Sequence, residues 1–152
     1  MICGPNGAGK STLSKAIATR HNVVCIDPDA LAVSGLSPIA AGKVAAAMAR
    51  TMIAHRISFA RESTFTAKFD FQIMQMAKEA GYAIHLTYIR LETPELAISR
   101  VQSRVLHGGH DVPEADIRRR YWRSLENLPR ALELVDEFVP LDNSEDGYRL
   151  KG

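Results

Sequence analysis

The chain has 152 residues, of which 46% are hydrophobic and 24% charged, and its formal net charge is +2 at pH 7. These ordinary values predict one globular domain over residues 1–152, large enough to bury a core of its own. The small net charge argues against nucleic acid as a partner. Without a long apolar run or a visible signal peptide, we expect a cytoplasmic protein with no membrane partner.

A phosphate-binding motif stands at the start of the chain. Residues 3–12 read CGPNGAGKST, and Gly4, Gly9, Lys10 and Ser11 match the pattern G-x-x-x-x-G-K-[ST]. Glycines let the backbone approach an anion closely, and the helix expected next adds the positive end of its dipole. The predicted nucleotide-binding residues are Gly4, Pro5, Asn6, Gly7, Ala8, Gly9, Lys10, Ser11 and Thr12.

ATP and Mg²⁺ are the cofactors that this motif predicts. Lys10 is expected to reach the β- and γ-phosphates, and the hydroxyl of Ser11 is expected to bind the metal. A buried strand normally precedes such a loop, but only MIC stands before Gly4. We therefore expect a trimmed first strand, and a trimmed C-terminal segment as well.

The rest of the chain alternates between strand and helix patterns. Apolar, β-branched runs predict strands at 22–27, 57–62, 83–91 and 137–144. Helical spacing predicts helices at 11–21, 37–56, 70–82, 94–107 and 114–128. This alternation is typical of an α/β fold with a mostly parallel central sheet and helices on both faces.

Local signals mark where several of these helices begin and end. Pro38 suits a first helical turn, and Thr93 followed by Pro94 predicts an N-cap and first position. Gly81 is expected to end a helix as a C-cap. Pro129 is expected to break or kink the last helix.

Carboxylates and arginines near the loop indicate what happens to the phosphate. Asp27 and Asp29 are predicted at the carboxyl end of the second strand, beside the loop, pointing to opposite sides of extended chain. Arginines gather around the glycine-rich segment 107–113, at 100, 104, 118, 119, 120 and 123. They predict a lid that could neutralise charge on a transferring phosphoryl group.

Other readings of these residues carry less weight. Transporter-type ATPases share the loop, but their L-S-G-G-Q signature is absent. His107 and His110 lack further ligands at zinc spacing. Cys3 and Cys25 are expected to be reduced core thiols.

The sequence resembles the zeta-toxin-like kinases, in particular a short branch often labelled predicted ABC-type ATPases. The matching stretches follow in order over essentially the whole chain: GPNGAGKSTL, DPDALA, RESTFT, GYAIHLTYIRL, ISRVQSRVLHGGHDVPEADIRRRYWRSLENL and PLDNS. The resemblance implies a three-layer P-loop kinase-like fold with an arginine-bearing lid. It also implies transfer of the ATP γ-phosphate to a hydroxyl of a small acceptor; better-studied zeta toxins act on UDP-N-acetylglucosamine.

The resemblance also implies roles for single residues. Asp29 would be the general base, while Glu62 and Thr64 would hold the acceptor. Arg104 and one arginine of 118–120, with Arg119 taken as the candidate, would clamp the phosphates. Two further residues are expected nearby: Asp27 at the acceptor or behind the metal, and Asn143 at the adenine.

The chain departs from the toxins in two places, and both concern the acceptor. Ala32 stands where the toxins carry a basic residue, and Ser63 where they have glycine or threonine. UDP-N-acetylglucosamine is therefore less secure than the chemistry. A kinase for another metabolite or a polynucleotide, and a nucleotide-binding module with little or no activity, stay open as alternatives. An antitoxin is the protein partner that the resemblance suggests.

Overall fold

The computed structural model describes residues 1–145 and 147–151, along which strands are separated by one or two helices except at the last pair. The strands are β1 (Ile2–Cys3), β2 (Val24–Ile26), β3 (Phe59–Ser63), β4 (His85–Arg90), β5 (Glu137–Asp142) and β6 (Arg149–Leu150). The helices are α1 (Lys10–His21), α2 (Pro28–Val33), α3 (Pro38–Ala54), α4 (Lys68–Glu79), α5 (Pro94–Leu106) and α6 (Glu114–Leu132).

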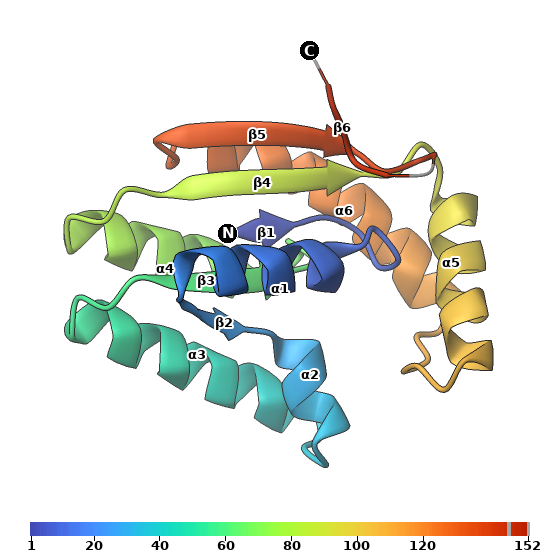
Figure 1. The fold of residues 1–152 in the computed structure, drawn as a ribbon, viewed down its shortest axis with the longest axis horizontal. Helices are drawn as coiled ribbons and strands as arrows, with labels where there is room; N and C mark the ends of the chain where they lie inside the picture. Colours follow the sequence, from blue (N-terminus) through green and yellow to red (C-terminus); the bar gives the residue numbers. More distant parts are fainter. Residues whose placement is uncertain (146, 152) are drawn as a thin grey trace.

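The strands form one sheet in the order β2-β3-β1-β4-β5-β6 (Figure 1). Strands β1 to β5 are parallel, and β6 pairs antiparallel with β5. Helices lie on both faces, so the predicted mostly parallel α/β sheet is confirmed. In the described part of the chain, no helix has the length and apolar character needed to cross a membrane.

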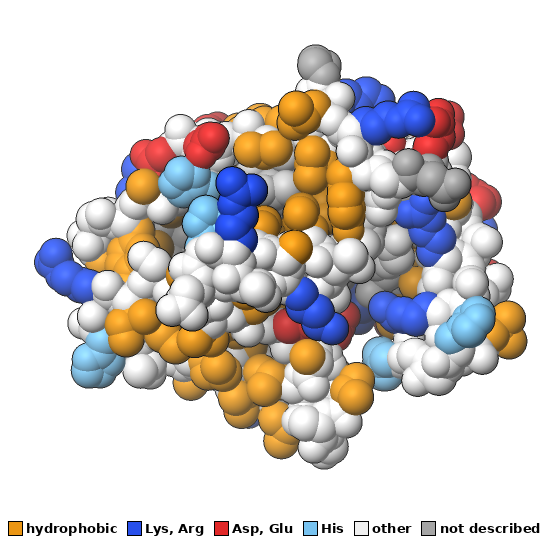
Figure 2. Space-filling model, in the orientation of Figure 1, with side chains coloured by type: hydrophobic (Ala, Val, Ile, Leu, Met, Phe, Trp, Pro, Cys, Tyr) orange, Lys and Arg blue, Asp and Glu red, His pale blue; other side chains and the backbone are white. Residues whose placement is uncertain are grey.

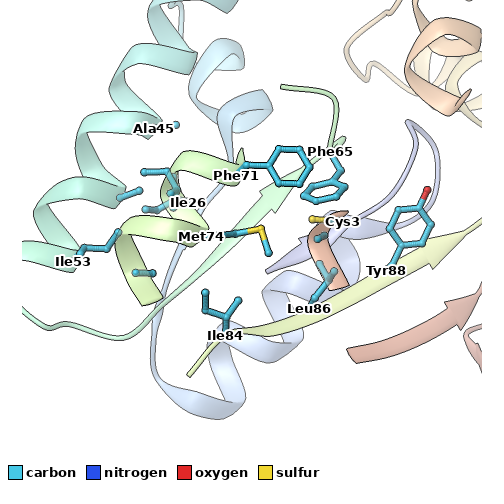
Figure 3. Packing of buried hydrophobic residues seen from close by; sticks show 14 residues of the cluster. Cys3, Ile26, Ala45, Ile53, Phe65, Phe71, Met74, Ile84, Leu86 and Tyr88 are labelled. Atoms are coloured by element: carbon cyan, nitrogen blue, oxygen red, sulfur yellow. The ribbon is translucent and has the colours of Figure 1, made fainter. Parts of the chain in front are cut away.

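Two apolar clusters fix the helices to the sheet. The two residues of β1 show the division, because Cys3 faces one cluster and Ile2 the other, as alternation along a strand requires. On the Cys3 side, Ile53 of α3 and Met74 of α4 pack under the sheet (Figure 3). On the Ile2 side, α1 and α5 supply the cover, for example through Val101.

The central strand β1 is also one of the shortest. Ile2 pairs with Glu62 of β3 on one side and Thr87 of β4 on the other. Strands β3 and β4 extend beyond the amino end of β1. A cavity of about 510 Å³, lined partly by Met1 and Phe59, lies next to that end. Its lining has none of the loop residues, so it is separate from the phosphate site.

Most predicted helix ends are confirmed. The Thr93 hydroxyl accepts a hydrogen bond from the Leu96 N–H at 3.1 Å, and Pro94 occupies the first turn of α5. Pro38 begins α3 in the same way. Gly81 follows the end of α4 with a φ of +83°, a left-handed conformation that suits glycine.

Three features differ from the sequence prediction. No helix was predicted over residues 28–33, but they form α2, because Asp27 caps a helix that begins at Pro28. Helix α6 does not break at Pro129, which lies inside it. The strand over 137–142 is not the last, since β6 follows.

Candidate active site

The loop between β1 and α1 has the backbone of an anion site. Gly4, Gly7 and Gly9 have positive φ angles of 145°, 75° and 88°. A Cβ on Gly4 would lie 2.3 Å from the Ile89 carbonyl oxygen, so the close approach of loop to sheet requires glycine. Among the described residues, the N–H groups of Gly9, Lys10 and Ser11 have no acceptor. These donors are available for a phosphate.

Lys10 carries a buried positive charge beside this loop. Its Nζ donates to the Pro5 carbonyl oxygen at 2.8 Å and has no acid within salt-bridge distance among the described residues. Burial lowers the pKa of the Lys10 ammonium, and the nearby charges of Asp29 and Glu62 act in the opposite direction. A buried cation without a paired anion is suited to binding a phosphate chain.

Glu62 links β3 directly to the loop helix. Its Oε2 accepts a hydrogen bond from the Ser11 hydroxyl at 2.9 Å, and its Oε1 accepts one from Ser14, a turn later on α1. Glu62 is only 4% exposed, and burial raises the pKa of its carboxyl, although the Ser14 hydrogen bond opposes the shift. The carboxylate thus contacts Ser11, the residue predicted to bind the metal. This places Glu62 closer to the phosphate loop than its predicted role at the acceptor implied.

Asp27 and Asp29 both lie on the wall of one cavity. Asp27 is the N-cap of α2, and its Oδ1 accepts the Asp29 N–H at 2.9 Å. Two expectations were therefore wrong: the pair does not point to opposite sides of a strand, and β2 is not adjacent to the loop strand. Strand β3 lies between β2 and β1.

That cavity, of about 640 Å³, adjoins the loop at Lys10 and also reaches Glu62 and Thr64. Side-chain contacts link its floor after β3: Arg61 and Asp70 form a buried ion pair, and Asp70 also accepts a hydrogen bond from the Ser63 hydroxyl at 2.7 Å. The segment predicted to hold the acceptor is therefore linked to α4 through Asp70, a residue that the sequence reading missed.

The backbone of this floor is strained. Phe65 has a φ of +59°, which is rare for a residue with a side chain, and it is fully buried. Its carbonyl oxygen accepts a hydrogen bond from Asn127 of α6 at 2.9 Å. Thr64 and Thr66 on either side contact each other through their hydroxyls at 3.1 Å and line the cavity.

The arginines divide between this cavity and the outer surface. On the face seen in Figure 2, basic and acidic side chains gather around a hollow between α2 and α5. Arg120 lines the cavity, whereas Arg119 is exposed and pairs with Asp116 at 3.0 Å. Arg104 donates to the His110 carbonyl oxygen at 2.7 Å, which folds it onto the segment 107–113 and not toward Lys10.

Asn143, the residue predicted to lie at the adenine, contacts the phosphate loop from the end of β5. Its Nδ2 donates to the Ala8 carbonyl oxygen at 3.0 Å. The position after β5 thus lies against the phosphate loop, as the sequence suggested. Of the residues that the sequence reading missed, Ser14 had a signal: it stands three positions after Ser11, on the same side of a helix.

Comparison with known proteins identifies the group to which this arrangement belongs. A model of the Zeta toxin family matches residues 1–139. The chain belongs to the Zeta toxin family. An uncharacterised protein of Haemophilus influenzae is 36% identical over 125 residues, covering 78% of this chain and 89% of the relative.

Solved structures resemble this Zeta toxin family member across most of its length. A chain of the PezAT chromosomal toxin–antitoxin system of Streptococcus pneumoniae aligns with a TM-score of 0.68 and 17% identity, covering 93% of this chain and 67% of that one. A gluconokinase from Sinorhizobium meliloti aligns with a TM-score of 0.60 and 20% identity, covering 95% and 81%. The predicted P-loop kinase fold is confirmed.

Proposed function

We propose that this protein is an ATP- and Mg²⁺-dependent phosphotransferase that moves the γ-phosphate to a hydroxyl of a small acceptor. One observation carries the proposal: Lys10, which follows β1, and Asp29, which follows β2, line the same cavity. Glu62 also lines it, from β3, the strand that lies between those two. A nucleotide on the loop and an acceptor in the cavity would therefore meet beside a carboxylate. Family and fold support this reading.

The residues present fit MgATP. The loop N–H groups that have no acceptor among the described residues would hold the phosphates together with the buried Lys10 ammonium. Ser11 would contribute its hydroxyl to the metal. Glu62 would orient that hydroxyl by accepting a hydrogen bond from it. When bound, Mg²⁺ would neutralise charge on the phosphates during transfer.

Asp29 would act on the acceptor hydroxyl. Its carboxylate would take the proton as the acceptor oxygen approaches the γ-phosphate in line. Lys10 and Arg120 would stabilise the charge of the transferring group from two sides of the cavity. Arg104 stays a candidate for the lid, but it would have to break its hydrogen bond to the His110 carbonyl oxygen to reach the phosphates. Arg120 takes the role expected of Arg119, which pairs with Asp116.

On the acceptor side, Thr64 would donate a hydrogen bond and Asp27 would hold α2 in place. UDP-N-acetylglucosamine is the first acceptor to test, since it is what the family resemblance implies. The PezAT structure is of a toxin–antitoxin system, and an antitoxin partner is proposed here by analogy. A kinase for another metabolite, or a nucleotide-binding module without turnover, are the competing functions.

Asp29→Asn tests the proposal, because it keeps the shape of the side chain and removes its basicity. ATP affinity should stay within a few-fold, while single-turnover transfer should fall by about 10²-fold or more. The assay would use UDP-N-acetylglucosamine first, then a metabolite extract with mass spectrometry to find the phosphorylated product.

Glu126→Gln is the matched control, since this carboxylate is exposed on α6 and outside the cavity. Equal transfer rates for wild type and Asp29→Asn would remove Asp29 from the mechanism. ATP binding without any phosphorylated product would favour the binding module.

A further inference from the structure

Two side chains from the end of the chain hold the phosphate loop from behind. The Tyr148 hydroxyl donates to the Gly9 carbonyl oxygen at 2.7 Å, and the Asn143 amide donates to the Ala8 carbonyl oxygen at 3.0 Å. Arg100 of α5 steadies their segment by donating to the carbonyl oxygens of Ser144 and Glu145, both at 3.3 Å. The loop is thus fastened to the sheet edge at β5–β6.

These hydrogen bonds contribute to the orientation of the loop N–H groups. In a trans peptide the carbonyl and the following N–H lie in one plane and point in opposite directions. A donor on the Ala8 oxygen therefore orients the Gly9 N–H away from Asn143.

The Gly9 oxygen already accepts hydrogen bonds from the N–H groups of Thr12 and Leu13 at 3.1 and 3.3 Å. Tyr148 adds a third donor, which helps to hold the peptide that carries the Lys10 N–H. The N–H groups of Gly9 and Lys10 are two of those left without acceptors in the described structure.

The contact is close enough to constrain the sequence of the loop. A Cβ on Gly9 would lie 2.8 Å from the Tyr148 Oη and 2.9 Å from the Asn143 Nδ2. Gly9 also has a φ of +88°. The space that a side chain would take is used by the two donors.

We propose that Tyr148 is a positioning residue for the phosphate loop, assisted by Asn143. It acts on the phosphate chain through the loop peptides and does not read the base. The inference rests on the proposed nucleotide function, and it concerns a residue outside the loop motif and outside the acceptor cavity.

The test is Tyr148→Phe, which removes the hydroxyl and keeps the ring. Tyr82→Phe is the matched control, because the Tyr82 hydroxyl also donates to backbone carbonyls, those of Met52 and Ile57 at 3.0 Å, far from the loop. Affinities for Mg²⁺-ATP and for inorganic tripolyphosphate would be measured by calorimetry at a temperature where circular dichroism shows all three proteins folded.

Tyr148→Phe should weaken both ligands by a similar factor of about five, the range expected for one net hydrogen bond. Tyr82→Phe should leave both affinities unchanged, although it loses a comparable bond. Equal affinities in wild type and Tyr148→Phe would overturn the proposal, and so would a loss confined to ATP, which would mean that Tyr148 contacts the base. A wild type that binds neither ligand would overturn the proposed function itself, and this inference with it.

Discussion

Glu62 places a carboxylate where its charge is costly unless a cation arrives. The side chain is almost fully buried between two serines of α1, and Lys10 is a weaker influence on its pKa than burial. Burial disfavours the ionised form of this carboxyl, and a cation bound near Ser11 would favour it. The free-energy cost of burying the Glu62 carboxylate therefore belongs to the binding site, and the fold itself does not need it.

This cost predicts a pH effect on stability. Because burial raises the folded pKa of Glu62 above the unfolded value of about 4.3, its contribution is fully present below that value. The contribution is lost as the pH rises through the folded pKa. Glu62→Gln removes the titration, so the free energy of unfolding of this variant should increase relative to that of wild type as the pH rises above about 4.3.

Urea unfolding of the metal-free protein at several pH values would measure the difference. Glu126→Gln, at an exposed position, should give a difference that does not change with pH. A difference between Glu62→Gln and wild type that is equally flat would contradict the prediction.

At the residue scale, the sequence predicted what is local. The phosphate loop follows a contiguous pattern, so Lys10 and Ser11 could be placed without any tertiary contact. The choice between Arg119 and Arg120 could not be made, because it depends on how α6 rotates when Ile117 and Tyr121 pack against the sheet. Their burial brings Arg120 to the cavity.

At the scale of elements, the ends of helices were predictable where a side chain supplies the missing hydrogen bond. The same rule could have found α2, since Asp27 followed by Pro28 is a cap and first position. The two residues also suit a turn, and packing of α2 against α3 decides between them. At Pro129 the tertiary packing of α6, with Ala131 fully buried, outweighs the lost hydrogen bond.

Thr93→Ala tests the cap of α5, the helix that carries Arg100 and Arg104. The change leaves the Leu96 N–H without its acceptor and should lower the free energy of unfolding by about 1 kcal/mol. Thr93→Ser keeps the oxygen and should cost much less. Chemical denaturation of the three proteins checks the order, and an alanine variant as stable as the serine variant would show that the cap contributes nothing.

At the scale of the whole molecule, the strand order explains why the site forms. The carboxyl ends of β2, β3 and β1 are neighbours in a parallel sheet, and they carry Asp27, Glu62 and the loop in that order. Alternation along the chain predicted such an edge. It could not tell that β3 lies between the other two, because strand order is set by crossover connections and not by local pattern.

This arrangement predicts strong coupling between nucleotide binding and global stability. The loop joins the central strand β1 to α1, and Glu62 and Tyr148 attach it to β3 and to the β6 edge. A ligand present at about 100 times its dissociation constant stabilises the native state by about 2.7 kcal/mol. For a chain of this size, that corresponds to a rise in Tm of about 5–10 °C.

Thermal unfolding with and without Mg²⁺-ATP measures this shift. Lys10→Ala removes the buried ammonium that would face the phosphates, so its Tm should hardly respond, whatever the change does to the stability of the free protein. Lys15→Ala is the control: this lysine lies on the same helix but is exposed, and its shift should equal that of wild type. Because each variant is compared with itself, altered folding cannot imitate lost binding. A full shift in Lys10→Ala would mean that the nucleotide binds elsewhere, and the loop would then lose its assigned role.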